Sequence, residues 1–262
     1  MERSARDDEA SLANGLDPCA PGPGQLTALM RLLHDSAEEA KRAKRIDPLI
    51  HCLYRQMKRT AKLLEDVPIA CRKGCSFCCN IWVDATAPEV LTAFKAIHKT
   101  EELIAAVRKA NELYAGLTFK QRWGMLTPCP MLADNLCSIY GSRPRVCRTA
   151  VSQDADACRR TYLELSQEGV PTPMVHVLAK TGFATALAGG LKRARLPHVS
   201  YDFTGALNRA LDTPECERRW LEGEDVFSGV QRSPVDVLTL PTNVQLYNLA
   251  FGTLNRRTGP LL

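Results

Sequence analysis

The sequence predicts a mainly α-helical protein with an irregular, cysteine-rich loop region inserted between helices. Apolar residues recur at helical spacing along most of the chain, as in Leu26, Leu29, Met30 and Leu33. Strand-like runs do not alternate with helical segments, which argues against a parallel sheet. In the middle of the chain, cysteines interleaved with proline and glycine mark the irregular region.

The N-terminal segment is expected to form a flexible extension over residues 1–24. It contains an Asn-Gly pair, an Asp-Pro pair and a Pro-Gly-Pro-Gly run, which are turn and breaker signals. Residues 25–262 are then expected to form a single helical domain that contains the cysteine-rich region 71–148. The chain of 262 residues, 45% of them hydrophobic, is long enough to bury one large core.

Helices are predicted on both sides of the cysteines. Two helices occupy residues 25 to about 66, with a break at Asp47-Pro48. A capping-box pattern from Thr86 to Glu89, with proline in the first turn, starts a helix that reaches about Tyr114. Further helices are predicted near residues 152–168, 173–194, 202–222 and 242–256.

The cysteines form a short first cluster followed by more distant members. Short loops bring thiolates to one point at a low entropic cost, which suits metals that prefer sulfur ligands. Seven thiols exceed what one tetrahedral ion or one four-iron cluster requires, so either two metals share thiolates or some cysteines are spare. The candidate metal ligands are Cys71, Cys75, Cys78, Cys79, Cys129, Cys137 and Cys147.

A disulfide framework is the main alternative explanation of these cysteines. Such frameworks belong to short secreted chains, whereas this chain begins without an apolar signal segment. The total of eleven cysteines is odd, so complete internal pairing is excluded. We therefore expect free thiols and a cytoplasmic location.

The motif residues resemble a known family. Cys-x3-Cys-x2-Cys-Cys at residues 71–79 is followed by Cys-Pro-Met-Leu at 129–132 and by Cys-Ser-Ile-Tyr-Gly-Ser-Arg-Pro-Arg-Val-Cys-Arg at 137–148. Together they resemble the YkgJ-like cysteine-cluster family, or CxxCxxCC domain, over about residues 71–148. The resemblance implies chelation of zinc or iron. A related cluster occurs in bacterial flagellin lysine methylases, but this chain has no glycine-rich cofactor loop after a strand, so methylase activity is not predicted.

The type of metal is not decided by cysteine ligands alone, because they serve both zinc and iron-sulfur centres. We favour an iron-sulfur cluster, since structural zinc sites usually combine two CxxC pairs and only Cys75 and Cys78 have that spacing. Arg143 and Arg148 are predicted to lie beside the cofactor and to offset its negative charge. Cys158 is considered as an eighth ligand, because a helix starting there would bring it close to the site.

Three functions follow from this centre. An iron-sulfur cluster would give a redox role or an enzymatic role with a partner, and a zinc ion would give a structural module for a protein or nucleic acid. The loop Cys71-x3-Cys75-x-Phe77-Cys78 also reproduces the three-cysteine loop of radical S-adenosylmethionine enzymes. The helical character upstream and the lack of a strand-helix barrel pattern argue against that third function. Whether the protein is an enzyme is left open.

Charge and hydropathy limit the partners. The net charge of +5 and the pI near 8.6 fall short of the basic surface that a dedicated nucleic-acid binder needs. The most apolar stretch, from Thr181 to Leu191, is interrupted by glycines and is shorter than a membrane span, so we expect no membrane partner. A protein partner of unknown identity is left open.

Overall fold

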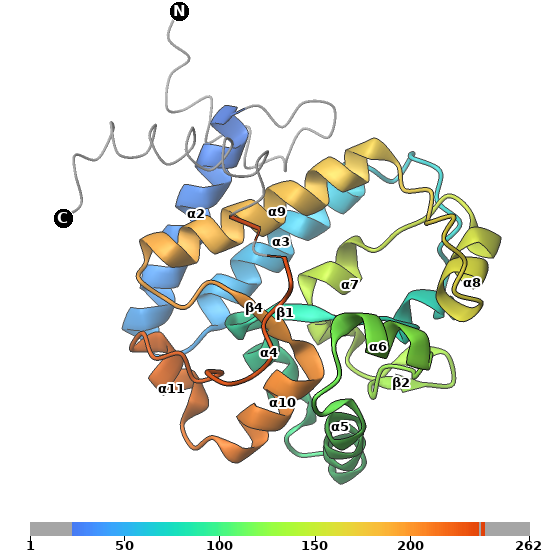
Figure 1. Cartoon of the computed structure of the whole chain (residues 1–262). Helices are drawn as coiled ribbons and strands as arrows, with labels where there is room; N and C mark the ends of the chain where they lie inside the picture. The colour runs from blue at the N-terminus through green and yellow to red at the C-terminus, as the bar shows by residue number, and fades with distance from the viewer. Residues whose placement is uncertain (1–22, 236, 239–262) are drawn as a thin grey trace, which may run out of the picture.

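The computed structural model describes residues 23–235 and 237–238, which fold into two groups of helices joined by a short strand pair (Figure 1). The first group contains α2 (Pro23–Ala43), α3 (Asp47–Leu63) and α9 (Met174–Arg193). The second group contains α4 (Ala87–Ile97), α5 (Glu101–Tyr114), α10 (Phe203–Asp212) and α11 (Cys216–Leu221). Between them, β1 (Asp84–Thr86) pairs antiparallel with β4 (Ser200–Asp202). The fold is mainly helical, as predicted.

The cysteine-rich region lies to one side of both groups, on the right in Figure 1. Short elements build it and leave most of its backbone irregular, as the sequence predicts for the region inserted between helices. These elements are η1 (Phe77–Asn80), α6 (Phe119–Met125), β2 (Leu132–Ala133), β3 (Leu136–Cys137), η2 (Tyr140–Ser142), α7 (Arg145–Thr149) and α8 (Ala155–Leu163).

The core of the first group depends on close contact between α2 and α9. A Cβ atom added at Gly190 would lie 3.0 Å from the backbone nitrogen of His34 and 3.2 Å from the carbonyl oxygen of Met30. Glycine is therefore needed at this point, because any side chain would push the two backbones apart. Every residue from Phe183 to Leu191 is buried, as expected for a helix that is apolar on all sides.

Helix α9 also has the length and hydropathy of a membrane span, and among the described residues it alone does so. However, 56% of its most apolar eighteen-residue window is buried within the fold. Its packing against α2 is that of a core helix in a globular protein.

The predicted capping box at the start of α4 is confirmed. The carboxylate of Glu89 accepts hydrogen bonds from the backbone nitrogen of Thr86 at 3.0 Å and from its hydroxyl at 2.7 Å. The other carboxylate oxygen accepts a bond from the backbone nitrogen of Arg145, the first residue of α7. Because Glu89 is fully buried, this single side chain fixes the start of α7 to the start of α4.

Two predicted helices are interrupted in the structure. The helix expected from residue 86 to about 114 is divided into α4 and α5, because Thr100 is extended and two glutamates at the next positions begin a new helix. The helix expected at 202–222 breaks between α10 and α11, since Thr213 precedes Pro214 and a residue before proline avoids the helical conformation. The helix expected at 242–256 lies outside the described residues.

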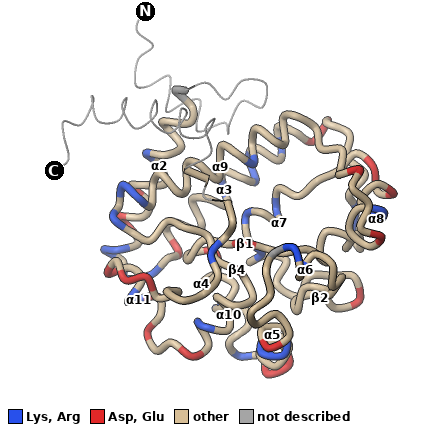
Figure 2. The backbone as a smooth tube through the Cα atoms, viewed as in Figure 1, with Lys and Arg blue, Asp and Glu red and all other residues tan. Residues whose placement is uncertain are grey.

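Two parts of the helical surface carry charges of both signs. Figure 2 shows lysine and arginine intermixed with aspartate and glutamate along α5 and around α11. Several of these residues pair with each other, as Arg108 does with Asp212 at 2.7 Å. Exposed pairs of this kind contribute little to stability.

Asp84 in β1 gives a testable pH dependence. Burial raises the pKa of its carboxyl group, the charge of Glu89 adds to the shift, and Arg145 and Lys180 oppose it. The folded state therefore holds this proton more tightly than the unfolded state, and stability falls as the pH rises from the unfolded pKa, about 3.9, to the folded one. We expect Asp84→Asn to increase the free energy of unfolding at pH 7, measured by urea denaturation.

A matched control for Asp84 is Asp212, whose pKa is lowered by its hydrogen bond with Arg108. Asp212→Asn removes an aspartate whose pKa is lowered in the folded state. This change should therefore not increase the free energy of unfolding at pH 7. A loss of stability in Asp84→Asn would mean that attraction to Arg145 and Lys180 outweighs the cost of burial.

Candidate metal centre

The first cysteine cluster is a tight loop that ends in η1. Gly74 adopts a φ of +85°, a conformation that side chains rarely allow, and this turn leads the chain from Cys71 to Cys75. The backbone nitrogen of Cys75 donates to Arg72 at 3.0 Å, and that of Cys79 donates to Ser76 at 2.9 Å. These bonds place Cys78 and Cys79 on one 3₁₀ turn.

The distant cysteines are joined to this loop through the backbone. The nitrogen of Cys129 donates to the carbonyl oxygen of Cys79 at 2.7 Å. The hairpin formed by β2 and β3 then brings Cys137 opposite Leu132, three residues after Cys129. At the hairpin turn, Asn135 accepts a hydrogen bond from the Ser76 hydroxyl at 2.7 Å. Two remote stretches of the chain therefore meet at the cysteines, as the sequence predicts.

Cys147 is delivered by α7, which is held from several sides. Besides the bond to Glu89, the hydroxyl of Tyr54 donates to the carbonyl oxygen of Arg143 at 3.1 Å, just before the helix. The Nε of Arg148 donates to the same oxygen at 2.9 Å, and its guanidinium lies 3.7 Å from the centre of the Tyr54 ring. Arg148 therefore shapes the turn that precedes Cys147.

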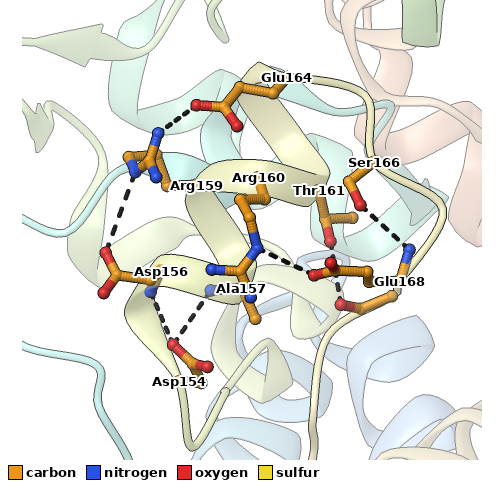
Figure 3. Close-up of polar contacts among 10 residues, drawn as sticks. Asp154, Asp156, Ala157, Arg159, Arg160, Thr161, Glu164, Ser166 and Glu168 are labelled. Carbon is orange, nitrogen blue, oxygen red and sulfur yellow. Dashed lines mark hydrogen bonds and ion pairs between the residues drawn. The ribbon is translucent and has the colours of Figure 1, made fainter.

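Helix α8 brings in Cys158, and a network of polar contacts fixes the helix (Figure 3). Asp154 caps it by accepting bonds from the backbone nitrogens of Asp156 and Ala157, at 2.8 and 3.0 Å. At its other end, Arg160 pairs with Glu168 at 2.9 Å. In addition, the chain before α8 bonds to the chain before Cys71, where the nitrogen of Ala70 donates to Ser152 at 2.7 Å.

The cysteines influence one another's pKa in two overlapping sets. Burial raises the pKa of Cys158, and the neighbouring thiolates of Cys71, Cys75 and Cys78 raise it further. Burial likewise raises the pKa of Cys147, with added effects from three other thiolates. We call Cys71, Cys75, Cys78 and Cys158 the first thiol group. The second thiol group is Cys78, Cys129, Cys137 and Cys147.

Cys78 belongs to both thiol groups. Its hydrogen bond with Cys79 is the main reason that its pKa is raised, followed by burial. In the second group, burial raises the pKa of Cys129 to about 11. Thiols with such pKa values are protonated at neutral pH, and a coordinated metal cation would deprotonate them. Metal binding to these groups would therefore release protons.

The donor chemistry of both groups fits a metal that prefers sulfur. The ten cysteines in the described residues are all free, which leaves the thiols available as ligands. Within the same residues, however, no three histidine, cysteine, aspartate or glutamate side chains already have the arrangement of a metal site. The thiols are neighbours, and ligation would require their side chains to turn toward a common point. Which of the seven predicted cysteines act as ligands stays a prediction.

Two arginines place positive charge near the thiols. The charge of Arg143 opposes the rise in pKa of Cys78 and Cys147. Arg122 acts in the same way on Cys129. No sequence motif surrounds Arg122, so sequence analysis overlooked it.

Arg122 is itself enclosed. Its guanidinium lies 3.8 Å from the ring centre of Tyr114 and 4.4 Å from that of Trp82. It also forms a 2.5 Å ion pair with Asp202, and both side chains are less than a tenth exposed. Asp202 in turn caps α10 by accepting a bond from the nitrogen of Gly205 at 2.8 Å. Arg122 thus connects the edge of the second thiol group to the helical body.

Aromatic side chains line the first thiol group. Burial raises the pKa of Tyr162 to about 12, with smaller effects from the thiolates of Cys158, Cys78 and Cys71. The ring of Trp123 packs edge-on against Tyr162, with 5.8 Å between ring centres.

The remaining described cysteines lie elsewhere. Cys52 is buried in α3 and Cys216 in α11, each within the hydrophobic core. Cys19 lies outside the described residues. A cysteine in such a core behaves as a small apolar residue.

Comparison with known proteins agrees with this geometry. The sequence model of the CxxCxxCC family, described as "Putative zinc- or iron-chelating domain", matches residues 70–165. The match begins one residue before Cys71 and extends through α8, so it includes every member of both thiol groups. Comparisons with curated proteins and with solved structures found no match. The part of the chain that carries both thiol groups thus matches the CxxCxxCC family, the cysteine-cluster family that the motif resembles.

Proposed function

We propose that the two thiol groups together bind an iron-sulfur centre and that the protein uses it for electron transfer or for catalysis with a partner. The observation that carries this proposal is the position of Cys78, whose thiol is electrostatically coupled to both groups. A thiol shared in this way favours a multinuclear centre over two independent mononuclear sites. An iron-sulfur cluster bound there would accept and donate single electrons.

The surroundings of the thiols support this choice over a simple structural ion. Arg143 and Arg122 hold positive charge close to the cysteines, which would stabilise an electron-rich cluster. The Tyr162 ring lies near the first thiol group and packs against Trp123. Positive charge and exclusion of water both adjust the reduction potential of such centres.

A structural zinc module is the second candidate. It is favoured by the small size of the elements that carry the distant ligands, since β2 and β3 have two residues each and α7 has five. Elements this short depend on contacts outside themselves, and a bound ion would supply them. In that case the domain would serve a protein or nucleic-acid partner.

A radical S-adenosylmethionine enzyme has less support. The two sheets in the described residues are antiparallel pairs, whereas the expected barrel consists of parallel strands. The segment before Cys71 leads from helix α3.

The free thiols support a cytoplasmic setting. Free cysteines near one another persist in a reducing compartment, so we place the protein in the cytoplasm. There, a protein partner would exchange electrons with the centre or complete its catalytic surface.

Anaerobic purification followed by elemental analysis and visible spectroscopy tests the choice of metal. We expect iron and inorganic sulfide, with a broad visible absorption that bleaches on reduction with dithionite. A colourless protein that contains zinc and no iron would replace the first proposal with the zinc module. If the protein retains neither metal, metal binding itself would be contradicted.

A further inference from the structure

A cavity of about 150 Å³ is lined in part by Arg145, the first residue of α7. Its walls come from the β1–β4 pair and the residues just before β4, from α7 and α9, and from residues that follow α11. An apolar cavity of this size holds a molecule as large as benzene. The polar residues that line this one are Thr86, Arg145, His198, Ser200, Arg232 and Ser233.

Arg145 is the feature of this cavity that its packing does not explain. The side chain is 4% exposed, and its Nε has no hydrogen-bond partner. Its guanidinium forms no ion pair with any of the described carboxylates within 4 Å. A buried guanidinium without partners costs several kcal/mol, so such groups are normally paired.

Among the described residues, the nearby carboxylates do not supply this partner. One carboxylate oxygen of Glu89 accepts bonds from Thr86, and the other accepts a bond from the backbone nitrogen of Arg145. Neither oxygen bonds to the guanidinium. Burial raises the pKa of Asp84 and the charge of Arg145 opposes that rise, but the two side chains form no ion pair within 4 Å. The second arginine of the cavity, Arg232, pairs with Asp225 at 3.2 Å and keeps other donors for a ligand.

We propose that this cavity binds a small ligand through a carboxylate or phosphate group, which Arg145 holds by parallel N–H bonds. A guanidinium presents its donors in a planar fork that matches two oxygens of such a group. Ser200 and Ser233 line the same cavity, and their hydroxyls are further potential donors. Ala184 and Ala188 of α9 form part of its apolar wall, together with Val199, Val235 and Val237.

The site is placed next to the metal centre by α7. Arg145 and Cys147 are two residues apart, and successive helical residues turn by about 100°, so they face nearly opposite sides. A ligand on Arg145 and a metal on Cys147 would therefore bind to the two faces of one short helix. The anion site does not depend on the metal being iron or zinc.

Isothermal titration calorimetry on the metal-loaded full chain tests this site. Inorganic phosphate and acetate are titrated separately at constant ionic strength, so that the two ligand classes are distinguished. We expect one saturable site for one of them and binding weakened by at least about tenfold in Arg145→Gln. Arg145→Lys should retain part of the affinity, because lysine keeps the charge and loses the fork.

Two further variants keep the test decisive. Ala184→Leu fills the cavity from α9 without changing a charge, and it should abolish anion binding while the metal content stays unchanged. Arg108→Gln removes an exposed arginine that pairs with Asp212 and should leave binding as it is. If Arg145→Gln does not fold, Ala184→Leu decides alone. Equal anion affinity in Ala184→Leu and the unmodified protein, or no binding of either anion, would overturn the proposal.

Discussion

Replacing Cys78 with serine is expected to remove metal from both thiol groups at once. A serine hydroxyl is a poor ligand for metals that prefer thiolate, and Cys78 is coupled to members of each group. Changing even an outer contact of a ligand lowers metal affinity by about 10- to 100-fold, so losing a shared ligand should cost at least 100-fold. The measurement is metal per chain by elemental analysis, with affinity from competition against a chelator.

Cys216→Ser is the matched control for Cys78→Ser. Cys216 is buried in α11, away from both thiol groups, and the same chemical change there should leave the metal content intact. Cys158→Ser separates the groups further, since Cys158 belongs to the first group and should affect that group more strongly. A full metal complement in Cys78→Ser would show that the two groups do not share this thiol.

Replacing Arg122 with alanine is expected to lower the free energy of unfolding by about 3 to 5 kcal/mol. The change would leave the buried carboxylate of Asp202 without its ion-pair partner at 2.5 Å. It would also open space between the rings of Trp82 and Tyr114, which now enclose the guanidinium. Loss of one partner of a buried pair is costly, because the remaining charge stays in a poorly solvated place.

Urea denaturation of the two proteins under identical metal loading measures this difference. The double replacement Arg122→Met with Asp202→Asn should recover part of the loss, because it removes both charges and keeps the volume. Arg108→Ala tests an exposed arginine of similar size and should change stability little. If Arg122→Ala unfolds at the same urea concentration as the unmodified protein, the ion pair does not stabilise the fold.

The long helices could be predicted because each carries its own local signals. The capping box at Thr86 and Glu89 marks the start of α4 in the sequence and forms in the structure. The β1–β4 pair could not be predicted, because strands of three residues are too short to show a periodic pattern. The two strands are also more than a hundred positions apart in the sequence. The helix break before Pro214 could have been predicted from the proline. The apolar pattern on either side of it, however, favoured one continuous helix.

The candidate site, too, could be predicted only where its signal is local in the sequence. Spacing identifies which cysteines are candidates, because a short loop keeps thiols together whatever the rest of the chain does. Their division into two groups depends on contacts between segments, such as the bond from Cys129 to Cys79. The approach of Arg122 to Cys129 depends on the packing of α6 against the helical body, which no local pattern records.

The turn at Gly74 leaves Cys71 as the exposed member among the seven predicted ligands, while the other six are partly covered. Dissolved oxygen, peroxide and small chelators in the surrounding medium would therefore meet the assembly at this sulfur first. Metal delivery and oxidative damage would then take place at the same exposed sulfur. A donor protein that loads the ion and an oxidant that removes it would compete for this edge of the molecule.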